Sequence, residues 1–208
     1  MLINFCQART IRTDGADTFF SDLALKLKAL DDLEISDPLP PAMAAATVKR
    51  YLAEDRFRIR LTDLVGSAVR HTAERLGEQS FSLMDDFSGV EFLRRLKIYQ
   101  AETEVLQHMI APLCQWGSTG HETCAVNIAE LAADYSTRGI GMYKDVWNNV
   151  RFFPSVLLLY AGGLAAVSSE NYGMLAALVN RPKYHDHEGE KSLFLTLSLR
   201  KVFGEAKP

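Results

Sequence analysis

The sequence predicts a mainly α-helical protein, a multi-helix bundle-like domain with room for short β segments at its N- and C-terminal ends. Two observations carry this prediction. An uncharged apolar run, FFPSVLLLYAGGLAAVSS, extends from Phe152 to Ser169, and a second apolar segment follows it and ends at Asn180. Further upstream, apolar residues recur at alternating steps of four and three from Phe92 to Leu113. Such spacing is typical of one face of a long helix.

The uncharged run is too interrupted to form one membrane-spanning helix. A bilayer span needs about 20 apolar residues in a single helix. Here Pro154 stands where a first helical turn begins, and a polar Ser-Ser-Glu-Asn turn closes the run. The pattern predicts two helices, Pro154–Val167 and Asn171–Asn180, that form a buried hairpin of a helical domain. We expect Gly162 and Gly163 at close contacts with a neighbouring helix, because neither carries a Cβ atom.

A capped helix is predicted to begin at Ser88. The segment Ser88-Gly89-Val90-Glu91 fits the capping box, in which the Ser hydroxyl accepts from the Glu amide and the Glu side chain accepts from the Ser amide. The seam that follows predicts a helix of about seven turns, with Pro112 kinking or ending its last turn. Other apolar residues widen this face, which favours a core stripe within the domain over a dimerising coiled coil. The seam consists of Phe92, Leu96, Tyr99, Thr103, Leu106, Ile110 and Leu113.

The segment Asp37–Pro41 is the best candidate for a domain boundary, because Asp-Pro-Leu-Pro-Pro ends any helix and makes a stiff connector. Residues 1–37 then form an N-terminal appendage, with a strand at Met1–Cys6 and a helix from Asp17. Residues 38–208 form the helical domain. Its other expected helices are Ala42–Glu54, Asp63–Leu76 (ended by Gly77), Glu122–Tyr135 and Met142–Phe153, followed by a polar loop, Lys183–Lys191, and by Ser192–Phe203, which fits either a strand or a leucine-rich helix.

Composition narrows the class of protein. The chain has 208 residues, 48% of them hydrophobic and 24% charged, which is typical of a soluble globular protein. A formal net charge of -3 gives no general attraction to nucleic acid or to acidic membranes. The three cysteines, Cys6, Cys114 and Cys124, form no C-x-x-C pair, and the N-terminus lacks the pattern of a secretory signal. We therefore expect reduced thiols and a cytoplasmic location.

Two patterns suggest chemistry, and neither is complete. His185-Asp186-His187-Glu188 would place two imidazoles on one face of a strand, but the surrounding charges suit a solvated loop and no third ligand is identifiable. His185 and His187 are thus weak metal candidates, and we expect no metal centre and no cofactor.

Cys124 follows His121 near a helix start, where a thiolate is stabilised, yet its spacing also suits a buried small hydrophobe. The loop Gly117–His121 lacks the Gly-Lys-Ser/Thr ending of a phosphate loop.

A basic stretch is the best candidate for contact with nucleic acid. Its cations can converge on phosphates, and the neighbouring aromatic residues Tyr51 and Phe57 can stack on bases. Ordinary surface charge explains the same pattern, because Glu54 and Asp55 interrupt it. The five basic residues are Lys49, Arg50, Arg56, Arg58 and Arg60. Asp85-Asp86 is a further carboxylate pair, but adjacent side chains usually point apart and seldom share acid–base work.

Three stretches resemble one family. Gly15-Ala16-Asp17-Thr18-Phe19-Phe20-Ser21-Asp22-Leu23 resembles the segment that leaves the nucleotide-binding domain of bacterial sirtuin-like anti-phage defence proteins. Lys49–Leu61 and Tyr160–Leu164 are similar to the helical region that follows it. The resemblance implies a C-terminal portion or a stand-alone homologue of such an effector. The glycine-rich NAD-binding opening and the Asn and His of NAD hydrolysis are not found in this chain, so no catalytic residue is carried over.

These observations favour a non-catalytic helical interaction module that senses, scaffolds or assembles within a multi-component, defence-type system. The expected partner is another protein or a second copy of the chain, and no membrane contact is expected. One alternative is a nucleic-acid-binding protein that uses the Lys49–Arg60 stretch. Another is part of an NAD-hydrolysing effector whose catalytic domain lies elsewhere.

Overall fold

The computed structural model of this chain describes residues 21, 39–78, 81–131, 145–186 and 189–197. These residues are mainly helical, with a two-stranded antiparallel sheet near the C-terminal end, so the predicted fold class is confirmed. The chain divides into two compact units, Met1–Asp37 and Pro38–Pro208. The predicted strand at Met1–Cys6 and the helix from Asp17, apart from Ser21, lie outside the described residues.

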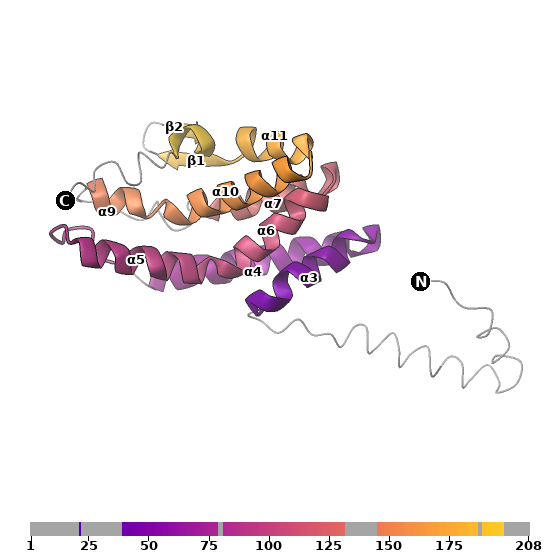
Figure 1. Ribbon diagram of the computed structural model, residues 1–208, viewed down its shortest axis with the longest axis horizontal. Helices are drawn as coiled ribbons and strands as arrows, with labels where there is room; N and C mark the ends of the chain where they lie inside the picture. Colours follow the sequence, from indigo (N-terminus) through magenta and orange to yellow (C-terminus); the bar gives the residue numbers. More distant parts are fainter. Residues whose placement is uncertain (1–20, 22–38, 79–80, 132–144, 187–188, 198–208) are drawn as a thin grey trace, which may run out of the picture. The chain divides into compact units, whose positions relative to one another are not determined.

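Figure 1 shows the elements of the larger unit. In chain order they are α3 (Pro41–Leu52), η1 (Asp55–Phe57), α4 (Arg58–Glu78), α5 (Gly89–Glu102), α6 (Glu104–Trp116), η2 (Thr119–His121), α7 (Glu122–Ala129), α9 (Asp145–Val150), α10 (Phe153–Ser168), α11 (Tyr172–Asn180), β1 (Lys183–Asp186), β2 (Gly189–Ser192) and α12 (Leu193–Thr196).

The predicted apolar hairpin is present as α10 and α11, and it is joined by a turn in which Asn171 caps α11. The Asn171 side chain accepts a hydrogen bond from the Met174 amide at 3.3 Å, as its sequence position predicted. α10 packs most extensively on α6 and also contacts α5, α7 and α11. In Figure 1, α10 lies between α11 on one side and α5 on the other.

Of the two glycines at the centre of α10, Gly162 makes the close contact and Gly163 does not. A Cβ atom at Gly162 would lie 2.9 Å from Leu178 Cδ1 of α11 and 3.1 Å from both Cys114 Sγ and Ile110 Cδ1 of α6. Nothing lies within 4 Å of the corresponding position at Gly163. The expectation that both glycines are close-contact positions was therefore wrong for Gly163, which faces away from these helices.

The long helix predicted from Ser88 is divided into α5 and α6 at Thr103. Thr103 is buried, and its hydroxyl donates to the carbonyl of Tyr99 at 2.7 Å. Its backbone lies at φ -92° and ψ 0°, which ends the regular ladder of α5. A Thr hydroxyl that bonds back to the preceding turn commonly bends a helix. Pro112 does not end α6, which continues to Trp116.

Arg95 of α5 is a buried charged residue. It is 1% exposed, and its guanidinium carbon lies 3.8 Å from the centre of the Trp147 ring. Its nitrogens donate to Glu91 at 2.8 Å and to the Ser82 carbonyl at 2.9 Å. Trp147 in turn donates to the Asp85 carbonyl at 2.8 Å. Arg95 thus fastens the 81–88 loop to α5 and α9.

Half of the predicted capping box at Ser88 is present. The Ser88 hydroxyl accepts from the Glu91 amide at 3.5 Å. The Glu91 carboxylate binds Arg94 at 2.6 Å and Arg95 at 2.8 Å. Hydrogen bonds from Arg94 and then Arg95 lower the pKa of Glu91 to about 2. This carboxylate is therefore ionised and paired with the two guanidinium groups.

The C-terminal segment differs from the predicted loop. Lys183–Asp186 and Gly189–Ser192 form an antiparallel hairpin with Lys183 opposite Ser192 and His185 opposite Glu190. Residues Leu193–Thr196 then form a short helix, with Leu193 buried and Leu195 exposed, so the helical alternative holds as far as this region is described. The backbone amide of Lys183 donates to a Glu130 carboxylate oxygen at 2.8 Å, which anchors the hairpin next to α7.

The remaining predicted helices are present, although residues 132–135 and 142–144 of two of them lie outside the described residues. α3 matches the helix expected from Ala42, and α4 begins earlier than predicted and continues through Gly77. Cys124, Ile128 and Leu131 lie buried along the α7 segment, as the spacing predicted. Val146, Trp147 and Val150 of α9 are also buried.

The two glycines of α10 provide a matched test of this packing. We expect Gly162→Leu to lower the free energy of unfolding by about 1–3 kcal/mol or more, because the added side chain meets α6 and α11. Gly163→Leu should leave it unchanged or raise it by roughly 0.5–1 kcal/mol, since leucine favours a helix more than glycine does. Urea unfolding of both variants measures the difference, and equal destabilisation of the two would contradict the assignment of the two faces.

Candidate functional site

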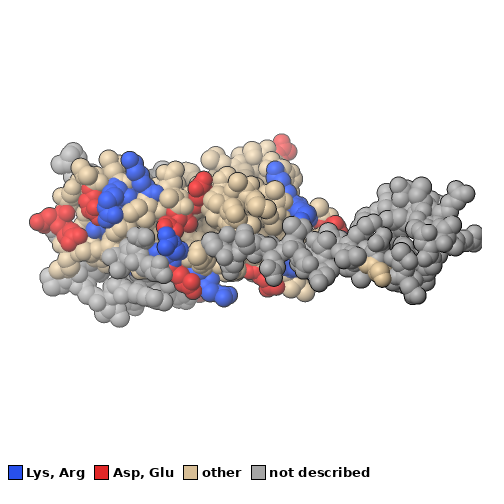
Figure 2. Space-filling view, turned by 90° about the horizontal axis from the view of Figure 1, so that it is seen from below, with Lys and Arg blue, Asp and Glu red and all other residues tan. Residues whose placement is uncertain are grey.

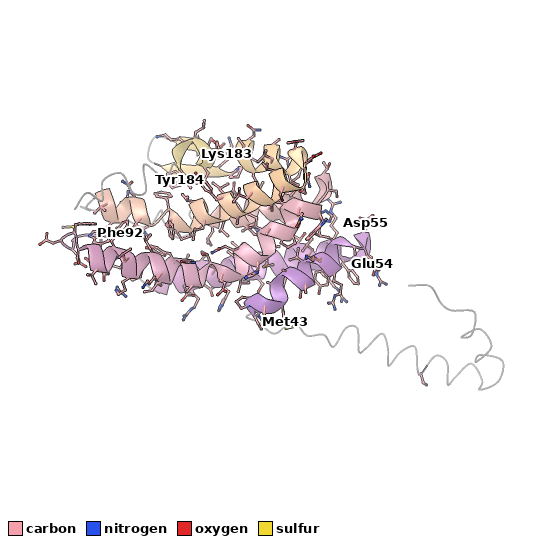
Figure 3. The ribbon with its side chains drawn as sticks, in the orientation of Figure 1. Met43, Glu54, Asp55, Phe92, Lys183 and Tyr184 are labelled. Atoms are coloured by element: carbon pink, nitrogen blue, oxygen red, sulfur yellow. The ribbon has the colours of Figure 1, made fainter. Side chains whose placement is uncertain are left out.

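The structure brings the basic stretch together at one end of the described helical domain. Lys49 and Arg50 lie in the last turn of α3, Arg56 lies in η1, and Arg58 and Arg60 lie in the first turn of α4. The segment from Asp55 thus forms a helical turn and the start of a helix. We call these five residues the basic corner. Figure 3 labels Glu54 and Asp55, which mark this end.

Nearby groups already engage several cations of the basic corner. Arg56 forms an ion pair with Glu54 at 2.7 Å and lies 4.6 Å from the centre of the Phe57 ring. The Lys49 ammonium lies 4.4 Å from the centre of the exposed Trp116 ring. On the face drawn in Figure 2, the Lys and Arg side chains of the described residues are interspersed with Asp and Glu. A compensated surface of this kind attracts nucleic acid weakly.

Arg58 lies over the loop that contains Gly120. A Cβ atom at Gly120 would lie 3.1 to 3.3 Å from three atoms of the guanidinium group, so a larger residue there would push the guanidinium aside. Arg58 and the Gly117–His121 loop, far apart in sequence, therefore meet at the basic corner. The arrangement places one guanidinium next to a loop whose Ser118 and Thr119 are exposed.

His121 has a structural role in this loop. It is buried, and its Nδ1 accepts from the Ser118 backbone amide at 3.1 Å, with the Ser118 hydroxyl also 3.1 Å away. Burial lowers the pKa of His121, the Arg58 charge lowers it further, and Asp55 acts in the opposite direction. The imidazole therefore serves as a neutral hydrogen-bond acceptor that closes the turn before α7.

Cys124 is held as a buried thiol. Its sulfur lies 3.8 Å from the Thr62 hydroxyl. Burial raises the pKa of Cys124, whereas the hydrogen bond with Thr62 and the charge of Arg58 lower it. Burial likewise raises the pKa of Cys114, which contacts Gly162, to about 12. A nucleophilic cysteine needs a lowered pKa. The structure thus favours the interpretation of Cys124 as a small core residue.

The metal candidates are only partly described. His185 lies in β1, opposite Glu190 of β2, whereas His187 lies outside the described residues. Within the described ranges, no three His, Cys, Asp or Glu side chains gather as a metal site would require. The metal interpretation of this pair stays a hypothesis from the sequence.

The turn between α10 and α11 is tied to the Gly117–His121 loop. Glu170 adopts φ 57°, a conformation that glycine usually supplies at the end of a helix. The amides of Glu170 and Asn171 donate to the carbonyls of Val167 and Ala166, which closes the last turn of α10. The Asn171 side chain then donates to the Gly117 carbonyl at 2.9 Å. The direction of α10 is therefore fixed at this end.

One exposed surface was missed by reasoning from the sequence. The residues Phe153, Leu157, Tyr160, Leu164 and Val167, at steps of four and three, form a row on α10 that we call the outer face. Phe153 and Leu157 are partly buried, whereas Tyr160 is 54%, Leu164 69% and Val167 53% exposed. Gly163 lies beside Leu164 and Val167, with open space above it. The opposite face, which includes Leu158, Gly162 and Ala166, is buried.

A signal for this surface was present in the sequence. A helix that is apolar all round is normally covered on all sides. The expectation of a buried hairpin assumed that neighbouring helices of the same domain cover α10 completely. Among the described residues, these helices bury the Gly162 side and leave Tyr160, Leu164 and Val167 exposed. The segment Val146–Ser168 is also long and apolar enough to span a membrane by length and composition, with 44% of its window buried.

No protein-family model, curated protein or solved structure matches this chain. The resemblance to sirtuin-like defence proteins stays a prediction from the sequence.

The basic corner yields a test of nucleic-acid binding. We expect the wild-type chain to show no salt-dependent binding to oligonucleotides, because acidic neighbours and aromatic rings already engage its cations. Changing Arg56, Arg58 and Arg60 together to Gln should leave both the absence of oligonucleotide binding and the unfolding free energy unchanged. Fluorescence anisotropy of a labelled oligonucleotide at several salt concentrations measures the binding, with Arg94→Gln on α5 as the charge control. Micromolar, salt-sensitive binding would contradict the expectation, and its salt slope would then fall by about one for each phosphate-binding arginine removed.

Proposed function

We propose that this chain is a helical protein-interaction module and that it binds its partner through the outer face of α10. The observation that carries the proposal is the exposure of Tyr160, Leu164 and Val167 on a helix whose other side is packed. These side chains form one row because they recur at helical spacing. A row of large apolar side chains on a rigid helix is a common anchor for a partner helix.

The energetics favour a covered state of the outer face. Burying a side chain of the size of leucine or valine completely contributes about 1.5–3 kcal/mol. Because Tyr160, Leu164 and Val167 are at least half exposed in the isolated chain, covering them with a partner would add a substantial part of this stabilisation. The α10–α11 turn and the contacts of Gly162 hold the helix in place, so little ordering entropy opposes binding.

The groups that suggested chemistry are consistent with a module of this type. His121 closes a turn, Cys124 fills the core, and Asp85 is 3.4 Å from the buried Arg95. The role in a multi-component defence system rests on the resemblance of Lys49–Leu61 and Tyr160–Leu164 to the helical region of sirtuin-like proteins. An assembly role suits such a region, because the resemblance brings no catalytic residue with it.

The native size of the chain in a cell extract tests the proposal. We expect the tagged wild-type chain to elute from a sizing column well above the mass of a monomer. Leu164→Asp should return it to monomer size, because the change places a charge in the middle of the outer face. Ile59→Asp is the matched control, since Ile59 is an exposed apolar residue of α4 outside the outer face. A wild-type chain that elutes as a monomer, or equal effects of both variants, would refute the proposal.

A further inference from the structure

We propose that the partner of the outer face is a second copy of this chain, with the two α10 helices packed antiparallel about a two-fold axis next to Gly163. This inference rests on the proposed function and specifies its partner. It is supported by the charge of the face, by its shape, and by the position of α10 in the domain.

The outer face carries no charge along its length. From Phe152 to Ser169 the chain contains no Asp, Glu, Lys or Arg. Two identical faces therefore meet without the like-charge repulsion that opposes self-association of most helix surfaces. The same face offers no charge that would select a basic or an acidic partner. Its chemistry fits an equally uncharged apolar helix, and the chain itself supplies one.

The shape of the face is self-complementary in an antiparallel pair. With a two-fold axis between Gly163 and Leu164, each Leu164 lies opposite Gly163 of the other copy, and each Tyr160 lies opposite Val167. The open space at Gly163 then has room for the leucine, as when the side-chain ridge of one helix fits the groove of another. The steps of four and three along the row are those of helices that interdigitate in this way.

Other occupants fit less well. If α10 spanned a membrane, the helices packed against it (α5, α6, α7 and α11) would have to enter the bilayer with it. α6 also carries the exposed residues Glu104 and His108, which would enter the bilayer with it. Helices that lie on a membrane surface carry Lys or Arg beside the apolar face. Another exposed apolar group, around Val90 and Leu93 of α5, is interrupted by the ion pair of Glu91 and Arg94.

Sedimentation equilibrium of the purified full chain over a range of concentrations tests the inference. We expect a monomer–dimer equilibrium in the wild type. Leu164→Asp should weaken the dimer on the order of 30-fold or more, as expected for a residue at the centre of an interface. Gly163→Leu should also weaken it, although the folded monomer has open space at that position and urea unfolding of dilute, monomeric protein should show no loss of stability. Ile59→Asp should leave the dissociation constant unchanged.

Disulfide trapping tests the antiparallel arrangement. In a Cys6→Ser background, a mixture of the Tyr160→Cys chain and the Val167→Cys chain should form a cross-linked heterodimer upon mild oxidation, and neither chain alone should do so. Cross-linking of either chain with itself would contradict the antiparallel pairing.

The outcomes separate the inference from the proposed function. A purified chain that stays monomeric at every concentration would overturn the inference. The proposed function would survive that result if the large species in the extract still depends on Leu164. A dimer unaffected by both Leu164→Asp and Gly163→Leu would place self-association on another surface and would also overturn the inference. If the wild-type chain co-sediments with net-neutral phosphatidylcholine vesicles and Leu164→Asp abolishes this binding, the partner of the outer face is lipid and not a second copy of the chain.

Discussion

The packing of α10 against α6 and α11 at Gly162 is the interaction on which the rest of the structure depends. Leu178, Cys114 and Ile110 approach the position where a side chain would begin to about 3 Å. The missing Cβ atom therefore sets how closely the helices pack. On the same side of α10, Ser155 donates to the carbonyl of Ala129 at 2.9 Å and joins α7 to this core. Because the Gly162 side of α10 is packed against these helices, the outer face points away from them.

At the opposite end of the domain from the basic corner, Arg95 holds the irregular segment before α5. Figure 3 labels Phe92, which marks this end. The rings of Phe92 and Phe87 lie around Trp147, and Trp147 covers the guanidinium of Arg95. A buried charge is costly unless its donors are satisfied. Here Glu91, Asp85 and the Ser82 carbonyl satisfy them, so a charged side chain fixes this loop together with the ring contacts of Phe81 and Phe87.

Local signals predicted much of the fold. Pro154 and Asn171 correctly marked the starts of α10 and α11, because the proline and the cap act within one turn of the residues they affect. Features that the apolar spacing does not encode were missed. The break at Thr103 follows from a hydroxyl bonding to its own helix while the residue is buried, which periodicity alone does not show. The burial of Arg95 depends on Trp147, far along the chain.

The candidate surfaces show the same division. Sequence alone identified the cations of the basic corner and the acidic residues Glu54 and Asp55 that offset them, but not the contact of Lys49 with the Trp116 ring. It identified the apolar character of α10 but not which side remains open. Gly162 and Gly163 are adjacent and chemically identical, and only the positions of α6 and α11 distinguish them. The row from Tyr160 to Val167 was visible as spacing, and its exposure required the packed neighbours.

The central claim is that the outer face of α10 is open in a single chain and covered in a pair. The labelling rate of Val167→Cys by a thiol reagent, measured at increasing protein concentration in a Cys6→Ser background, tests it most directly. The account predicts rapid labelling of dilute protein and slower labelling as concentration rises, while the buried Cys114 and Cys124 react only after unfolding. A labelling rate independent of concentration, or protection even in dilute protein, would contradict it.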